Sequence, residues 1–244
     1  MKKRFGFTLA EVLITLGIIG VVAAMTIPTL IQNTNSTKWA SQYKKDLATL
    51  TNAIEMAQAH NDIDISVLTQ PCVAGPAAGT ITFDTGAVEN RNSICSLINT
   101  TLSGVQYVST LQGFYTDGTQ RYNIINGTGA ALEDTLVYRL ADGSVIGVNR
   151  TLGRANNTCA VQPGQDPGAV LGAECKGFID VNGVNPPNRV IQCNGAASPN
   201  TTSRATCATV RNNGDVFDVF PIVLYNGTAA PSSAAAATLL SQTK

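Results

Sequence analysis

Six cysteines are the side chains with the most evident chemistry in this sequence of 244 residues. They could bind zinc as thiolates or form disulfides in an oxidising compartment. Zinc sites use ligand pairs separated by two to four residues, whereas consecutive cysteines here are 23, 64, 16, 18 and 14 positions apart and His60 is the one histidine. We therefore predict disulfides, with Cys72–Cys95 as the favoured local pair and the connectivity of the other four left open. The six are Cys72, Cys95, Cys159, Cys175, Cys193 and Cys207.

A carboxylate in an unusual place is the second candidate for chemistry. Glu11 is the single ionisable side chain in the apolar run from Phe7 to Ile27, which follows three basic residues at positions 2–4. About twenty apolar residues suffice to cross a bilayer, and an acidic side chain within such a segment is costly and usually functional. One alternative is a carboxylate that extends to the membrane interface. Another is a conventional secretory signal cleaved near Ala24, which leaves Glu11 unexplained.

The apolar run continues into an amphipathic pattern. Apolar residues recur at spacings of three or four, as expected for one helix face, at Trp39, Tyr43, Leu47, Leu50, Ile54 and Ala57. Polar residues, Lys45 and Asp46 among them, are predicted to occupy the other faces. Pro28 is compatible with a kink in a membrane helix. We predict one helix from about Phe7 to about Ala59, apolar all round in its first half and packed on a domain in its second.

The N-terminal residues carry a family resemblance. The sequence G-F-T-L-A-E-V-L-I-T-L from Gly6 to Leu16, after a basic leader and before Pro28, resembles the class III signal of type IV pilins, which type II secretion pseudopilins share. In that family a membrane prepilin peptidase cleaves after the glycine, and the new terminus is N-methylated. The resemblance implies cleavage between Gly6 and Phe7, with Glu11 as the family's glutamate and Pro28 as its helix-kinking proline. In a filament, Glu11 would pair with the Phe7 amine of a neighbour, because two opposite charges are tolerable in an apolar bundle only together.

The rest of the chain is predicted to form a head domain. A short helix is predicted at 92–102, and strands at 104–111, 121–125, 135–140, 144–149, 178–181 and 216–225, with a hairpin turn at Ala141-Asp142-Gly143. We predict an α+β fold in which the long helix packs on a mostly antiparallel sheet, which agrees with the type IV pilin-like fold that the resemblance implies. The predicted divisions are a leader (1–6), a membrane and filament-core half-helix (7–30), an amphipathic half-helix (31–60), a disulfide-stapled head (61–225) and a low-complexity, mobile tail (226–244).

Oxygen-bearing side chains near the C-terminus suggest a calcium site. The stretch 178–220 is similar to a C-terminal motif of pseudopilin-like proteins, in which D-V-N-G and P-N precede D-x-F, and some relatives bind calcium in a C-terminal loop. Asp180, Asn182, Asp215 and Asp218 would supply the oxygens that Ca²⁺ prefers. The alternative is an ordinary turn, because Asp-x-Asn-Gly is common turn chemistry and the spacing lacks the closing Glu of an EF-hand. No cofactor is required, and a structural calcium ion is a hypothesis.

Composition narrows the function. Sixteen Lys and Arg balance sixteen Asp and Glu, and no basic block favours nucleic-acid binding. The sequence contains no P-loop, nucleophile elbow or metalloprotease helix, so we do not expect an enzyme. We predict a structural subunit of a type IV pilus-like or type II secretion pseudopilus filament, anchored in the bacterial inner membrane with its head on the periplasmic side. Its partners would be prepilin peptidase, identical or related pilin subunits, an inner-membrane assembly platform and the lipid bilayer. The alternative is a membrane-anchored or filament-tip module that binds a surface, a secreted substrate or DNA.

Overall fold

The structure is a computed structural model of the whole chain. It describes residues 8–68, 72, 92–110, 135–150, 152, 158–183, 185, 187–194, 207, 210 and 216–242. The predicted processing site at Gly6 and Phe7, the predicted strand at 121–125 and the predicted ligand Asp215 lie outside these residues.

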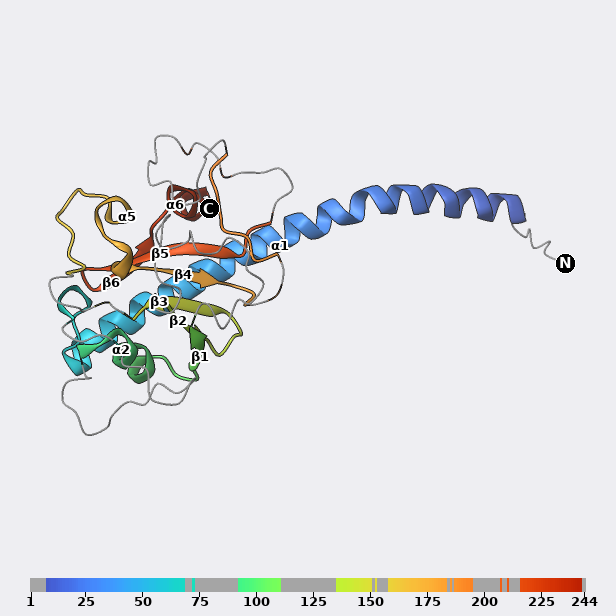
Figure 1. The fold of residues 1–244 in the computed structure, drawn as a ribbon. Coiled ribbons are helices and arrows are strands. Elements are labelled where there is room, and N and C mark those ends of the chain that lie inside the picture. Colours follow the sequence, from blue (N-terminus) through green and yellow to red (C-terminus); the bar gives the residue numbers. More distant parts are fainter. Residues whose placement is uncertain are drawn as a thin grey trace.

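One long helix, α1 (Leu9–Asn61, 53 residues), forms the stalk of the molecule (Figure 1). It runs without interruption through Pro28, and it ends where Asp62 adopts a left-handed conformation and donates its N–H to the Ala57 carbonyl. The first half of α1 extends away from the head, and the second half crosses the sheet (Figure 1). The predicted helix is therefore confirmed, including its continuation beyond the proline.

The head is built on a six-stranded sheet in which each strand pairs antiparallel with its neighbours in chain order. Its strands are β1 (Gln106–Thr110), β2 (Thr135–Arg139), β3 (Val145–Asn149), β4 (Lys176–Asp180), β5 (Val219–Tyr225) and β6 (Thr228–Pro231). The predicted β2–β3 hairpin is present, and its turn uses Gly143 at φ 93°, a left-handed angle that favours glycine. Together with α1, this sheet confirms the predicted α+β fold.

The main core lies between α1 and the sheet. Tyr43, Leu50 and Ile54 of α1 are buried there, and the Tyr43 ring stacks on Phe220 of β5 at a centroid distance of 4.4 Å. The short helix α2 (Ile94–Thr101) packs against α1 and adds further apolar side chains to this core. A smaller cluster that includes Phe178 forms a second core. The spacing of apolar residues along α1 thus identified the surface that holds the head.

The chain after β5 belongs to the head. Asn226 and Gly227 both have positive φ, 43° and 77°, and turn the chain into β6. The helix α6 (Ala234–Gln242) follows, with Ala235 and Ala236 fully buried. The prediction of a mobile tail is wrong for residues 226–242, because small alanine side chains let α6 approach α1 and β6 closely. Asn-Gly is a strong hairpin signal that would have revealed β6 in the sequence.

Three disulfides join consecutive cysteines. They are Cys72–Cys95, Cys159–Cys175 and Cys193–Cys207. The first is the pair favoured from sequence, and it connects the segment after α1 to α2. The second disulfide lies at Cys175, the last residue of η4 (Ala173–Cys175), which follows the short helix α5 (Pro167–Val170) and directly precedes β4. A further single turn, η1 (Ile65–Val67), follows α1. All six sulfur-bearing side chains are buried, so the disulfides belong to the core.

Candidate functional site

The N-terminal end of α1 is organised around Glu11. Thr8 is the N-cap residue, and its Oγ1 accepts a hydrogen bond from the Glu11 N–H at 3.3 Å. In return, the Glu11 carboxylate accepts the Thr8 N–H at 2.8 Å and the Thr8 hydroxyl at 2.7 Å. This reciprocal arrangement is a capping box, which satisfies backbone donors at the start of a helix. Sequence reasoning identified Glu11 but missed Thr8, although T-x-x-E before an apolar run is the signature of such a box.

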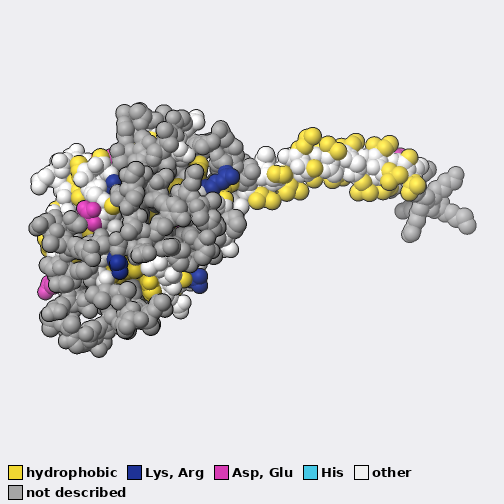
Figure 2. Space-filling view, viewed as in Figure 1, with side chains coloured by type: hydrophobic (Ala, Val, Ile, Leu, Met, Phe, Trp, Pro, Cys, Tyr) yellow, Lys and Arg dark blue, Asp and Glu magenta, His cyan; other side chains and the backbone are white. Residues whose placement is uncertain are grey.

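The first half of α1 presents a predominantly apolar surface. Its large side chains are exposed, from Leu9 (77% exposed) to Ile31 (53% exposed). Figure 2 shows hydrophobic side chains covering the part of the helix that extends from the head. Among the described residues, one helix, α1, has the length and the apolar composition that are needed to cross a membrane. An apolar surface of this size requires a lipid or protein environment.

Hydroxyl groups along this apolar half bond to the backbone of their own helix. Thr15 donates to the Val12 carbonyl at 3.0 Å, and Thr26 donates to the Val22 carbonyl at 2.9 Å. Thr29, next to Pro28, donates to the carbonyl of Thr26 at 2.9 Å. Such internal bonds hide polar groups from an apolar environment and help to accommodate a proline inside a membrane helix. The threonines are therefore compatible with the apolar character of the whole segment.

The comparisons with known proteins agree with this geometry. Residues 1–27 match the family model of the prokaryotic N-terminal methylation motif. The chain carries a prepilin-type signal of the type IV pilin and pseudopilin kind. Searches of curated proteins and of solved structures gave no match.

This prepilin signal and α1 together give the chain its class. The motif implies processing by prepilin peptidase and assembly with pilin subunits, and it points to a structural subunit, not to an enzyme. The long apolar helix that follows the motif fits a membrane-anchored pilin. The motif covers Glu11 and most of the apolar half of α1, so the match and the capping box concern the same segment.

The candidate calcium ligands in the described residues are engaged with backbone amides. Asp180, at the end of β4, accepts the Asn182 N–H at 3.2 Å. Asp218 is buried before β5 and accepts the N–H groups of Asn188 at 2.7 Å and Arg189 at 2.5 Å. Asp180 therefore stabilises the turn directly after β4, and Asp218 fastens the backbone at Asn188 and Arg189 to the start of β5. Among the described residues, no group of three or more His, Cys, Asp or Glu side chains is placed to hold a metal ion, and calcium stays a hypothesis.

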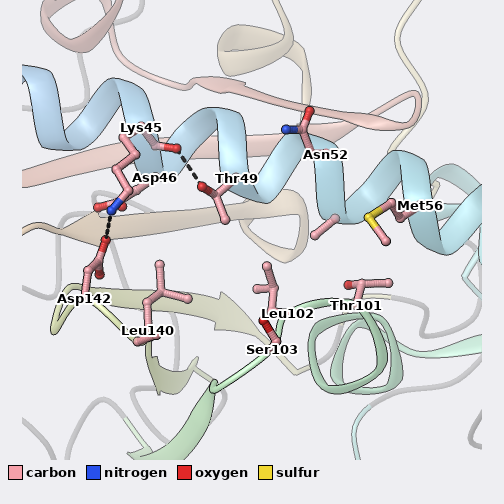
Figure 3. A pocket seen from close by; sticks show the side chains of 12 residues that line it. Lys45, Asp46, Thr49, Asn52, Met56, Thr101, Leu102, Ser103, Leu140 and Asp142 are labelled. Carbon is pink, nitrogen blue, oxygen red and sulfur yellow. Dashed lines mark hydrogen bonds and ion pairs between the residues drawn. The ribbon is translucent and has the colours of Figure 1, made fainter.

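A buried acidic side chain on α1 was missed. The helical pattern predicted Asp46 on a polar face, but the side chain is only 1% exposed. It faces the β2–β3 turn, which carries Asp142 (Figure 3). No local sequence signal marks this burial, because the residues that cover Asp46 lie about a hundred positions away in the chain.

Proposed function

We propose that this protein is a structural subunit of a filament of the type IV pilus or type II secretion pseudopilus kind. The single observation that carries the proposal is the form of α1. Its first half is an exposed apolar helix with a prepilin signal, and its second half buries one apolar face in the core of a folded head. A subunit with this form waits in the inner membrane and then exchanges lipid for neighbouring helices, which are equally apolar.

The charges at the N-terminus give the proposed anchor its orientation. The basic residues at positions 2–4 precede the apolar half, and positive charges beside a membrane helix favour the cytoplasmic side. We expect the head to lie outside the cytoplasm, a location that the three disulfides support because such bonds are stable in oxidising compartments. Prepilin peptidase would remove residues 1–6 at the cytoplasmic face, and an inner-membrane assembly platform would move the mature subunit into the filament.

Glu11 has the central role in the proposed assembly. Cleavage after Gly6 creates an amine at Phe7, and burying this positive charge in a helix bundle requires a partner of opposite sign. The Glu11 carboxylate of a neighbouring subunit supplies that charge, and a shift in axial register would leave both groups unpaired. In the single chain the same carboxylate is held by Thr8, so the proposal separates two roles of Glu11, capping its own helix and pairing with a neighbour.

Variants of Thr8 and Glu11 test the proposal in the native host. The filament fraction sheared or extracted from cells is quantified for wild type, Glu11→Gln, Thr8→Ala and Glu55→Gln, an exposed carboxylate on the head half of α1. We expect Glu11→Gln to abolish filaments, Thr8→Ala to retain most of them and Glu55→Gln to match wild type. Equal losses for Thr8→Ala and Glu11→Gln would reduce Glu11 to a helix cap and refute the pairing between subunits.

Intact-mass spectrometry of the membrane-purified protein tests the processing step. We expect a mass that lacks residues 1–6 and carries one additional methyl group, and a gain of about six hydrogens on reduction, since each disulfide takes up two. An uncleaved chain, or one cut near Ala24, would overturn the filament proposal in favour of an anchored or secreted binding domain. A filament at the cell surface would indicate a pilus, and one confined to the periplasm a pseudopilus.

A further inference from the structure

A polar cluster joins α1 to the β2–β3 turn at the rim of the head. It consists of Gln42, Lys45 and Asp46 on α1 and of Asp142 and Ser144 at the turn. The Gln42 side-chain nitrogen donates to Asp46 Oδ1 at 2.9 Å and to Asp142 Oδ2 at 2.6 Å, so one amide bridges the two carboxyl groups. The cluster lies beside a groove of about 330 Å³ between α1, the α2–β1 connection and the turn (Figure 3).

The two carboxyl groups have very different surroundings. Asp142 Oδ1 accepts the Ser144 N–H and hydroxyl at 3.1 and 2.7 Å, and its Oδ2 accepts Gln42 and Lys45 Nζ at 2.6 and 2.8 Å. Asp46 is buried, and its Oδ2 accepts no hydrogen bond from the described residues. An anionic oxygen without a donor is costly to bury, whereas a carboxylate with four donors is stable as an anion. The geometry therefore favours a protonated Asp46 beside an ionised Asp142.

The titration behaviour of the two groups agrees with their geometry. Burial raises the pKa of Asp46 to about 7, the negative charge of Asp142 acts in the same direction, and hydrogen bonding to Ser144 and Gln42 opposes these two effects without cancelling them. Burial would also raise the pKa of Asp142, but hydrogen bonds from Lys45, Ser144 and Gln42 hold it well below its usual range. Pairs of carboxyl groups whose environments push their pKa values apart commonly share one proton.

We propose that the proton on Asp46 acts as a latch that fastens the β2–β3 turn to α1 in acid and loosens this contact as the pH rises to neutrality. The latch comprises Gln42, Lys45, Asp46, Asp142 and Ser144 and does not depend on filament formation. Ionisation of Asp46 places a second negative charge against Asp142, and the Lys45 ammonium group, which pairs with Asp142, faces both carboxylates. From the α2–β1 side the groove is lined by Thr101, Leu102 and Ser103, none of which is ionisable in this range.

The direction of the pH effect follows from linkage. Below the ordinary pKa of an aspartate, Asp46 is protonated whether the turn is closed or open and does not contribute to the pH dependence. In that range the low pKa of Asp142 weakens closure as the pH falls, because the open form takes up a proton that the closed form does not. Between that value and about 7, the open form loses the proton while the closed form keeps it, so closure weakens by up to tenfold for each pH unit. Above about 7, both forms are ionised and the equilibrium no longer changes.

Hydrogen exchange of the full chain in detergent micelles tests the latch. Exchange of a peptide that covers residues 140–146 is followed in wild type and in Asp46→Asn, which resembles the protonated side chain, at the same series of pH values. The ratio of the two rates removes the intrinsic pH dependence of exchange. We expect this ratio to rise at least about tenfold from pH ~5 to pH ~7 and then to level off. A ratio that is constant across the series would overturn the latch.

Two further measurements test the shared proton, and the first of them does not depend on the stability of Asp46→Asn. Asp142→Asn removes the neighbouring charge and so lowers the pKa of Asp46 in the closed form, and the rise in exchange should level off at lower pH than in wild type. An unchanged position would show that Asp46 does not share its proton with Asp142 and would overturn the paired mechanism. Infrared spectroscopy of wild type at pH ~6 should show the carbonyl stretch of a protonated carboxyl that Asp46→Asn lacks, and no such difference would refute protonation of Asp46.

Discussion

Removal of the Cys72–Cys95 disulfide should destabilise the head strongly. The bond closes a loop with a sequence separation of 23, and Cys72 and Cys95 are both buried in the main core. The chain-entropy relation for a loop of this size gives about 3.4 kcal/mol at 25 °C. The loss of two buried sulfur atoms adds about 1 kcal/mol for the space they leave. The double variant Cys72→Ala/Cys95→Ala should therefore lower the free energy of unfolding by about 4 kcal/mol.

Urea denaturation of the full chain in detergent measures this change. Trp39 is the one tryptophan and packs against the main core, so its fluorescence reports on the junction between α1 and the head. With a slope of about 2 kcal/mol/M, the loss corresponds to a decrease of about 2 M in the urea midpoint. The Cys159–Cys175 pair closes a loop with a separation of 16, for which the same relation gives about 3.1 kcal/mol, so its double Ala variant is a matched comparison.

A clear result would refute this reasoning. If the Cys72–Cys95 variant shifts the midpoint by less than about 0.5 M at an unchanged slope, restriction of the unfolded chain is not the source of its stabilisation. Reduction of the wild-type protein provides a second measurement, because it breaks this bond together with the other two disulfides without changing the sequence. Reduction and substitution should lower the midpoint in the same direction.

Two substitutions in the head test its packing with the same denaturation assay. Gly147→Ala places a Cβ atom against the ring edge of Phe178 at Cε1, so the ring must move, and we expect a loss of about 1–3 kcal/mol. Gly17→Ala, whose added Cβ meets nothing within 4 Å, should leave head stability unchanged. Ala235→Asp places a charge at a fully buried position of α6 and should cost about 3 kcal/mol or more, whereas Ser241→Asp at the exposed end of α6 should cost little. Equal effects of Ala235→Asp and Ser241→Asp would contradict the packing of α6 in the head.

Local patterns predicted the parts of the fold that local physics determines. The apolar spacing from Trp39 to Ala57 identified the buried face of α1, and Ala141-Asp142-Gly143 identified the β2–β3 hairpin. The C-terminal elements were missed because an alanine-rich segment carries no amphipathic signal, although Asn226-Gly227 marked the turn into β6. Burial of α6 depends on close approach to other elements, which composition alone does not reveal.

The candidate site shows the same division between local and distant causes. Glu11 stood out in the sequence because an isolated carboxylate in an apolar run is conspicuous, and its partner Thr8 lies three residues away. Asp46 looked like any polar residue on the exposed side of a helix. Its burial comes from a turn 96 positions further along the chain, so only the assembled fold brings Asp46 and Asp142 together.

The position of the latch determines what its release would change. Tyr43 stacks on Phe220 in the main core, and Leu50 and Ile54 are fully buried beside it, so α1 is fixed to the sheet by apolar contacts that do not titrate near neutral pH. Asp46 and Asp142 lie at the rim, where the contact involves only the turn between β2 and β3. Ionisation of Asp46 should therefore free this turn and widen the adjacent groove without detaching the head from its stalk. We therefore expect pH to change only the turn and the groove at the surface of the head. The apolar half of α1, which is proposed to assemble the filament, should not respond to ionisation of Asp46.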